Sequence, residues 1–194
     1  MAFIEPVTLT GHHVQLEPLA TGHHEALVDA TSDGELWKLW YTSVPSPQSM
    51  RSWIDSALSM QAHDELTFVV RDMRDGSIVG STRYFRVDAL NRRLEIGNTW
   101  HARRVQRTGI NTEAKLLLLG HAFETLDCIA VEFRTHWIKH QSRAAIARLG
   151  AKQDGVLRNH QRMADGTLRD TVVFSVIDAE WPTVKRHLQY KLER

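Results

Sequence analysis

A basic segment that contains one glycine carries the clearest chemical signal in this sequence. The segment, Arg103-Arg104-Val105-Gln106-Arg107-Thr108-Gly109-Ile110-Asn111-Thr112, separates an expected strand from an expected apolar helix, and Lys115 adds a further positive charge. N–H groups at the start of a helix are free to bind an anion, the helix dipole favours negative charge there, and glycine allows close approach of a phosphate. The segment predicts a phosphate-binding loop, although a plain connection between two elements fits the same residues.

Glu95 is the candidate acid–base residue. In a strand expected over 93–100, it shares a face with Gly97 and Thr99. The opposite face carries apolar side chains, those of Leu94, Ile96 and Trp100. If the apolar set faces the core, Glu95 faces a substrate, and partial burial could raise the pKa of its carboxyl group to about 6 or 7, as a general base requires. An ordinary ion pair with Arg93 or with a neighbouring strand explains Glu95 equally well.

Several other kinds of site do not fit the sequence. No G-x-G-x-x-G pattern and no Gly-Lys-Ser/Thr follows a strand, which argues against a dinucleotide-binding fold and a nucleoside triphosphatase. A G-x-S-x-G elbow is also missing, and Cys128 is expected to be a small buried residue at the start of a strand. His136 and His140 are four residues apart, but His136 is expected to end a strand and no third ligand follows at a recognised spacing, so no metal site is predicted.

The elements that must position these residues begin with strands. Alternation over 7–19, broken near Gly11, predicts a strand pair or a bent strand, and a helix is expected from Thr21. Ser46 and Pro47 predict the N-cap and the first turn of a second helix. Two alternating runs joined by Asp75-Gly76 then predict a hairpin over 66–87, before the strand that carries Glu95.

The second half of the chain predicts one crossover and one further hairpin. The expected elements are a helix over 111–125, a strand over 129–137, a short helix ending at 149, a hairpin turn at 165–166, a strand over 171–177 and a helix from 181. The predicted fold class is therefore mixed α/β (α+β), with a largely antiparallel meander, a β-α-β crossover and a C-terminal hairpin. No linker or repeat is found, so residues 1–194 are expected to form a single domain.

Composition limits the partners of the protein. The chain has 194 residues, and its 24 Lys and Arg nearly cancel its 23 Asp and Glu, so no general field attracts nucleic acid or an anionic membrane. The densest apolar run, over 116–119, is much shorter than a membrane span, and no signal-peptide pattern precedes it. A single cysteine excludes an intrachain disulfide. We expect a cytoplasmic protein with no nucleic-acid or membrane partner.

The basic segment also resembles a known motif. Gln106-Arg107-Thr108-Gly109-Ile110-Asn111 is similar to the Q/R-x-x-G-x-G/A pyrophosphate loop of the Gcn5-related N-acetyltransferase (GNAT) superfamily, with Asn111 in place of the last small residue. Further segments resemble the RimJ/RimL-like branch, which contains the ribosomal-protein N-terminal acetyltransferases. These segments are Leu94-Glu95-Ile96-Gly97, residues 106–119, residues 142–151, Leu157-Arg158, Asp165-Gly166, Arg169-Asp170-Thr171 and Glu180-Trp181-Pro182. The resemblance covers nearly the whole chain.

This resemblance implies a GNAT-type fold, in which a twisted, mostly antiparallel sheet flanked by helices is splayed between the strands at 93–101 and 129–137. It implies an acetyltransferase that uses acetyl-coenzyme A (acetyl-CoA) and no metal, with the pantetheine in the gap and direct attack by a primary amine in a ternary complex. The implied cofactor-binding residues are Val105, Gln106, Arg107, Thr108, Gly109, Ile110, Asn111, Thr112, Lys139 and Arg143.

The resemblance also implies catalytic roles. Glu95 matches a glutamate that the family often places at this position. Ser142 matches by spacing the serine that acts as general acid in the ribosomal-protein branch, although a helix N-cap or a surface position is the commoner role of a serine. Many relatives use a tyrosine one turn later, where this chain has Ile146.

Three further residues depart from the family pattern. The motif T-D-x-x-N-x-x-S-R corresponds to residues 135–143, where His136 replaces the acidic residue and Lys139 replaces an asparagine that contacts the cofactor. Lys139 is still expected to approach the cofactor, but as a charge. A second acidic residue of the ribosomal-protein branch falls at Arg162. These departures leave the assignment of base and acid open.

The acceptor is expected to be a small-molecule amine or a protein N-terminus. Candidate lining residues are Trp37, Trp40, Tyr41, Tyr84, Asn98 and His160, although core packing explains the spacing of the first three as well. A homodimer is compatible with the branch. Two alternatives from other classes stay open, a non-catalytic module that binds or senses acyl-CoA and an RNA- or ribosome-associated protein, and the near-zero net charge disfavours the second.

Overall fold

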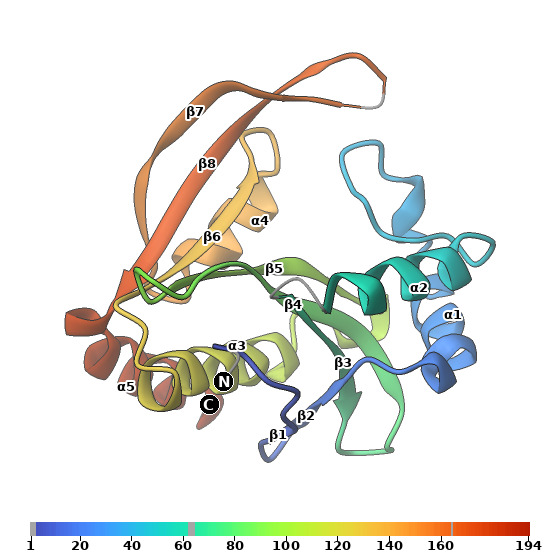
Figure 1. Cartoon of the computed structure of the whole chain (residues 1–194). Coiled ribbons are helices and arrows are strands. Elements are labelled where there is room, and N and C mark those ends of the chain that lie inside the picture. The colour runs from blue at the N-terminus through green and yellow to red at the C-terminus, as the bar shows by residue number, and fades with distance from the viewer. Residues whose placement is uncertain (1–2, 62–64, 164) are drawn as a thin grey trace.

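The computed structural model describes residues 3–61, 65–163 and 165–194 (Figure 1). Eight strands form one open sheet in the order β1-β2-β3-β4-β5-β6-β8-β7, and the paired neighbours are antiparallel except for β5 and β6. The strands are β1 (Leu9–Thr10), β2 (Val14–Pro18), β3 (Leu66–Asp72), β4 (Ile78–Asp88), β5 (Arg93–His101), β6 (Ala130–His136), β7 (Lys152–Arg162) and β8 (Leu168–Ile177). The predicted mixed α/β fold with a mostly antiparallel sheet is confirmed.

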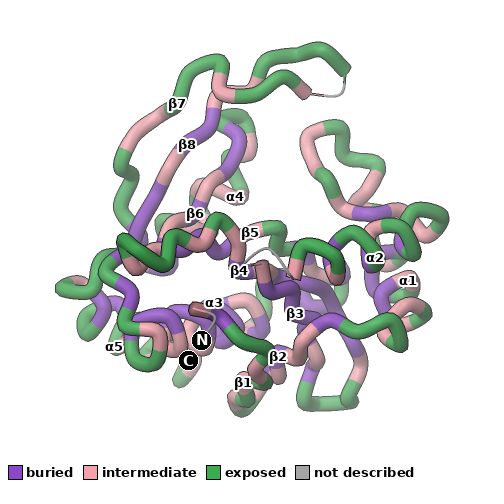
Figure 2. The backbone as a smooth tube through the Cα atoms, viewed as in Figure 1, coloured by how far each residue is buried: buried purple, intermediate pink, exposed green. Residues whose placement is uncertain are grey.

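Helices cover both faces of this sheet. The α-helices are α1 (His24–Ser32), α2 (Met50–Met60), α3 (Ile110–Gly120), α4 (His140–Ala147) and α5 (Trp181–Leu192). Helix α3 packs against α5 below the sheet in Figure 1, and α1 and α2 lie together on the other side of the central strands. Figure 2 shows that buried residues concentrate in the central strands, whereas the outer part of the β7–β8 hairpin is exposed. None of the described helices is both long enough and apolar enough to span a membrane.

Helix α2 begins later than the sequence indicates. Residues 47–49 form a turn, the N-cap is Ser49, and the first helical residue is Met50. The N–H of Ser49 donates to the hydroxyl of Ser46 at 3.2 Å, and the N–H of Ser46 donates to the hydroxyl of Ser49 at 2.9 Å. The expectation that Ser46 is the N-cap and that Pro47 lies in the first turn was wrong, because the two serines close a turn ahead of the helix.

A bulge in β5 changes which side chains share a face. Asn98 has a positive φ of 48°, and the strand register shifts so that Arg83 pairs with Gly97 while Ser81 pairs with Trp100. Two residues of β5 therefore face one residue of β4. An extra residue in one strand reverses the alternation of side chains beyond it.

The consequence is visible at Thr99 and Trp100. The hydroxyl of Thr99 accepts a hydrogen bond from Lys115 of α3 at 2.7 Å, and the ring of Trp100 packs edge-on against Trp53 of α2 with centroids 6.4 Å apart. The expectation that Thr99 shares the face of Glu95, and Trp100 that of Leu94 and Ile96, was wrong because the bulge intervenes.

Candidate active site

The sheet opens between β5 and β6. These parallel strands pair only from Arg93–Ala130 to Glu95–Glu132, and β6 then continues beside β8 as far as the pair His136–Thr171. A cleft of about 750 Å³ lies where the strands part. This opening confirms the predicted splay of the sheet, and no strand of the described residues pairs with β5 beyond Glu95 on that side.

The cleft brings together residues from many parts of the chain. Strands β4, β5 and β6, helices α2, α3 and α4, the segments before α2 and α3, and the β7–β8 hairpin all contribute to its walls. The predicted site residues that line it are Glu95, Val105, Gln106, Arg107, Asn111, Lys139 and Ser142. Thr108, Gly109, Ile110, Thr112 and Arg143 are not among the lining residues in the described part of the chain.

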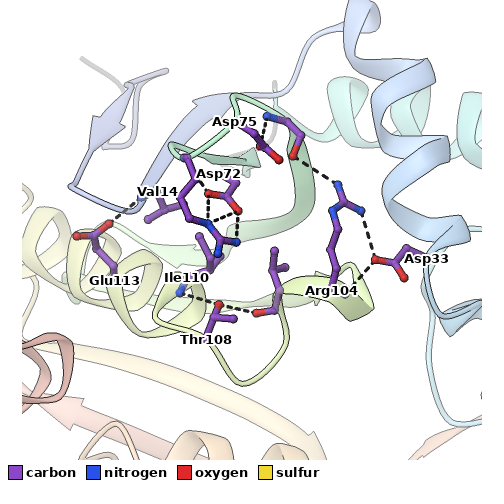
Figure 3. A network of polar contacts seen from close by, with 11 residues as sticks. Val14, Asp33, Asp72, Asp75, Arg104, Thr108, Ile110 and Glu113 are labelled. Carbon is purple, nitrogen blue, oxygen red and sulfur yellow. Dashed lines mark hydrogen bonds and ion pairs between the residues drawn. The ribbon is translucent and has the colours of Figure 1, made fainter. Parts of the chain in front are cut away.

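The loop before α3 is held in a defined shape by its own side chains. The hydroxyl of Thr108 donates to the carbonyl of Val105 at 2.7 Å and accepts from the N–H of Ile110 at 3.3 Å (Figure 3). The side-chain amide of Gln106 donates to the carbonyl of His101 at 3.0 Å, and Arg107 has a left-handed backbone with φ of 63°. This short turn delivers the chain into α3 at Ile110.

Two carboxylates fix the start of α3 from either side (Figure 3). Asp33 accepts a hydrogen bond from the backbone N–H of Arg104 at 2.9 Å and pairs with its guanidinium at 3.3 Å. Glu113 accepts from the N–H groups of His12, His13 and Val14 at 2.9, 2.6 and 2.7 Å. Because the first i to i−4 hydrogen bond runs from the Glu113 N–H to the Gly109 carbonyl, the N–H groups just before Glu113 have no partner within the helix.

Two residues of the predicted loop, Ile110 and Thr112, turn their side chains into the protein, and a third, Gly109, has no side chain. Ile110 is buried, and the hydroxyl of Thr112 accepts from Arg148 at 3.0 Å. Gly109 has ordinary helical dihedrals, and a Cβ atom there would contact Leu192 at 3.5 Å and His13 at 3.7 Å. These are ordinary van der Waals distances, so neither packing nor the backbone conformation requires glycine here, and the close approach of a phosphate stays a prediction.

Glu95 lies almost buried in the floor of the cleft. The residue is 4% exposed to solvent. Its Oε2 atom lies 3.1 Å from Nη1 of Arg86 and 3.5 Å from Nε of Arg134. Burial raises the pKa of the carboxyl group to about 7, although Arg86 and Arg134 both lower it. Arg93 pairs with Glu132 at 2.6 Å instead. Glu95 therefore has both the raised pKa that a general base requires and the ion pairs with neighbouring strands that were the alternative explanation.

Ser142 and Lys139 lie near the start of α4. Lys139 is the N-cap of α4, so Ser142 is not. The half-buried side chain of Ser142 lines the cleft, and its hydroxyl has no hydrogen-bond partner in the described part of the chain. The ammonium of Lys139 lies 5.4 Å from the ring centre of Tyr41. Arg143 instead stacks on Trp137 at 4.1 Å and donates to its carbonyl at 3.3 Å.

A buried polar cluster below the bulge was missed by sequence reasoning. Lys115 is 5% exposed, and its ammonium donates to the hydroxyls of Thr82 at 3.0 Å and Thr99 at 2.7 Å. Burial lowers the pKa of Lys115 to about 7, and burial together with Lys115 lowers the pKa of His101 to about 4. The sequence suggested a lysine that adds surface charge near the loop. Lys115 lies one helical turn before the buried residues Leu118 and Leu119, and this spacing was the signal that it faces the core.

The acceptor candidates divide into three groups. Asn98 and His160 line the cleft. Tyr84 was a wrong prediction, because it is fully buried and its hydroxyl donates to the carbonyl of Leu118 at 2.6 Å. The third group does not line the cleft within the described part of the chain, and it consists of Trp37, Trp40 and Tyr41.

The remaining candidates for reactive groups have structural surroundings. Cys128 is buried, and burial raises the pKa of its thiol to about 11, as expected for an unreactive cysteine. His136 ends β6 and His140 begins α4, in agreement with the sequence. Within residues 3–61, 65–163 and 165–194, no three His, Cys, Asp or Glu side chains gather into a group that could hold a metal.

Comparisons with known proteins agree with this geometry. Residues 13–152 match the family model described as the acetyltransferase (GNAT) domain. YdaF of Bacillus subtilis (strain 168), which carries the name of a ribosomal N-acetyltransferase, is 33% identical over 107 residues, and the match covers 55% of this chain and 57% of that protein. The chain thus spans little more than half the length of this curated relative.

Solved structures share the fold over nearly all of the chain. A GCN5-related N-acetyltransferase from Brucella melitensis is 30% identical, with a TM-score of 0.87 over 97% of this chain and 86% of that one. RimJ of Mycobacterium smegmatis, determined in complex with CoA-disulfide, is 22% identical, with a TM-score of 0.80 over 96% of this chain and 95% of that one.

Proposed function

Since the chain belongs to the acetyltransferase (GNAT) domain family, we propose that it transfers an acetyl group from acetyl-CoA to a primary amine of a small molecule or a protein N-terminus. The amine attacks the thioester directly in a ternary complex. The likeness to YdaF and RimJ supports the RimJ/RimL-like branch. We also propose that residues 1–194 act as one domain in the cytoplasm.

One observation carries this proposal. The parting of β5 and β6 after Glu95 creates a single cleft, and Glu95, Ser142 and the loop before α3 all border it. A long, flexible donor can therefore lie along the cleft with its phosphates at one place and its thioester at another. The carboxyl group of Glu95, whose pKa is about 7, borders the same cleft as the loop before α3, and this supports the proposal.

The residues of the cleft fit the donor. The N–H groups of Asn111 and Thr112 at the start of α3, together with Arg107, would bind the pyrophosphate. The free backbone groups of β5 beyond Glu95 would bind the amides of pantetheine, as an added strand would. Bound acetyl-CoA supplies the activated thioester. RimJ of Mycobacterium smegmatis, which shares the fold, was solved with CoA-disulfide.

Glu95 and Ser142 would then move the protons. Glu95, with a pKa of about 7, takes the proton from the acceptor ammonium, so that the neutral amine forms the new C–N bond. The C–S bond breaks, the hydroxyl of Ser142 donates a proton to the departing thiolate, and the serine recovers a proton from the nitrogen of the new C–N bond. Partial burial of Glu95 matches its pKa to neutral pH, where a general base works best.

The first test is calorimetric titration with acetyl-CoA, followed by a free-thiol release assay over amino acids, polyamines and short peptides. Binding with amine-dependent thiol release is expected. Binding without release from any amine would contradict the transferase and favour a module that senses acyl-CoA. Failure to bind acetyl-CoA would overturn the role given to the loop before α3.

A further inference from the structure

The cleft is far more basic than the protein as a whole. The chain has a net charge of +1, yet Glu95 is the one acidic residue among the described residues that line the cleft. The basic lining residues are Arg83, Arg86, Arg107, Lys115, Arg134, Lys139 and Arg169. Several of them have acidic partners: Arg83 pairs with Glu65 at 2.7 Å, and Arg86 and Arg134 pair with Glu95.

In the described chain, four of these cations form no salt bridge: the exposed Arg107 of the loop before α3, the buried Lys115, and the half-buried Arg169 and Lys139. Arg169 of β8 is half-buried, and its Nε donates to the hydroxyl of Thr171 at 3.1 Å, but no carboxylate in the described chain forms a salt bridge with it. Lys139 is likewise half-buried and contacts the face of Tyr41. Burial and the neighbouring Arg169 lower the pKa of Lys139. Half-buried like charges without a counter-ion are costly, so the site is built for an anion.

The position of Arg169 indicates which anion. The charge of Glu95 acts on Arg169 and that of Arg169 acts on Glu95, so the two side chains lie within electrostatic reach across the cleft. The phosphates of the donor are assigned to the start of α3, whereas Arg169 projects from the β7–β8 hairpin, on the far side of β6 from β5. Arg169 therefore lines the same cleft as Glu95, but on a different wall from the proposed phosphate site. The wall of Arg169 is the one left for the acceptor amine.

We infer that Arg169 and Lys139 bind a carboxylate or phosphate group of the acceptor itself, so that the substrates are primary amines with an anionic group close to the amine. The inference rests on the proposed function. The planar guanidinium of Arg169 can donate two parallel hydrogen bonds to either group, and Lys139 adds a point charge. Lys139 thus serves the acceptor rather than the cofactor to which the sequence assigned it.

The test compares acceptors in matched pairs. Glycine is compared with glycinamide, and phosphoethanolamine with ethanolamine, in the thiol-release assay at saturating acetyl-CoA. The amine of glycinamide is the less basic of its pair and is more often neutral, so amine reactivity alone favours the amide. We expect kcat/KM to favour the anionic member of at least one pair by about tenfold or more. The two pairs distinguish a carboxylate from a phosphate.

Arg169→Gln should remove this preference. We expect KM for the anionic acceptor to rise about tenfold or more, while KM for the uncharged member and the affinity for acetyl-CoA stay unchanged. Arg162→Gln is the matched control, since Arg162 is an exposed arginine of the same hairpin whose guanidinium bonds the carbonyl of Gly166 outside the cleft. Arg169→Lys is a second variant, to be used if Arg169→Gln fails to fold. It keeps the positive charge and should therefore retain part of the preference for the anionic acceptor.

The outcomes separate the two proposals. Equal turnover of charged and uncharged amines would overturn the inference and leave the transferase intact. If Arg169→Gln weakens acetyl-CoA binding and leaves the acceptor KM unchanged, the arginine serves the donor and the inference is wrong. Binding of acetyl-CoA without release from any amine would overturn the proposed function, and the inference with it.

Discussion

At the residue scale, the chemistry depends on how the protein changes the protonation of single groups. Glu95 is surrounded by the guanidinium groups of Arg86 and Arg134, which favour its charged form, yet burial dominates and the pKa of its carboxyl group is about 7. The balance matters because a fully exposed glutamate would be too weak a base and an isolated buried one would stay protonated.

Glu95→Gln tests this balance. We expect kcat to fall by about 10²- to 10⁴-fold, with the affinity for acetyl-CoA unchanged, because the amide cannot accept the proton. In the parent protein kcat/KM should rise as the pH increases through about 7, where the base becomes deprotonated, and the variant should lose this dependence. Glu25→Gln, at an exposed position on α1, is the control. A variant that retains the parental rate would remove Glu95 from the mechanism.

Ser142→Ala tests the proton donor. The substitution removes one half-buried hydroxyl at the cleft and should lower kcat by about 10²-fold or more without weakening acetyl-CoA binding. Ser52→Ala, on the exposed surface of α2, is a matched change outside the cleft. Equal rates for the two variants would show that the departing thiolate takes its proton from elsewhere.

Lys115 links protonation to stability. The pKa of Lys115 is about 7 in the folded protein and has its ordinary value of 10.5 in the unfolded chain. Between these pH values the unfolded chain binds more protons, so this group makes stability rise with pH. Lys115→Met should abolish that contribution, which reaches at most about 1.4 kcal/mol per pH unit. Urea unfolding of both proteins at pH 7 and pH 9 measures it. The stability of the variant relative to the parent should be greater at pH 7 than at pH 9, and a constant difference would contradict the buried, neutral lysine.

At the element scale, the start of α3 depends on contacts made by distant segments. Glu113 ties the turn between β1 and β2 to the first turn of α3 through three N–H groups, and Asp33 holds the approach to the loop through Arg104. These contacts fix the helix start whose free N–H groups are proposed to bind the pyrophosphate. The loop sequence supplies the residue types, and other elements supply its orientation.

Gly11→Ala tests the anchor on Glu113. A Cβ atom at Gly11 would lie 2.5 Å from Cδ of the Glu113 carboxyl group, and Glu113 cannot move without weakening its three hydrogen bonds. We expect a loss of about 1–3 kcal/mol in unfolding free energy and weaker acetyl-CoA binding. Gly22→Ala is the control, because a Cβ atom there meets nothing within 4 Å. Identical melting and binding of the two variants would contradict the anchor.

At the scale of the whole molecule, charge is separated rather than abundant. The net charge of the chain is only +1, but basic side chains line the cleft, so the attraction for an anionic ligand is local. This separation explains how a nearly neutral protein can guide a donor that carries several phosphates. The residues that create it come from β4, the loop before α3, α3, β6, the N-cap of α4 and β8, which meet only in the folded protein.

Salt measures this local field. Raising the ionic strength from about 0.01 M to about 1 M shortens the screening length from about 30 Å to about 3 Å. We expect the association rate of acetyl-CoA, followed by stopped flow, to fall by about tenfold or more. S-acetyl pantetheine lacks the phosphates and should associate at a rate that salt hardly changes. A donor rate that does not respond to salt would show that the basic lining does not steer the ligand.

The sequence by itself determined the order of the elements and the nature of the loop. Hydrophobic periodicity and turn residues are local properties, so the hairpin of β3 and β4, the crossover through α3 and the helix from Trp181 could all be predicted, and the loop around Gly109 pointed to the family. The splay between β5 and β6 followed from that resemblance. Element boundaries were less certain, as the late start of α2 at Met50 shows.

Tertiary structure decided which side chains meet. The bulge at Asn98 depends on the pairing of β5 with β4, so no pattern within β5 could reveal that Thr99 and Trp100 exchange faces. Burial of Tyr84 and Lys115 depends on how α3 packs on the sheet. Arg169 and Glu95 line the same cleft only because β8 pairs with β6, which in turn pairs with β5. Contacts between residues far apart in sequence arise from the packing of whole elements, and periodicity within one element carries no record of its neighbours.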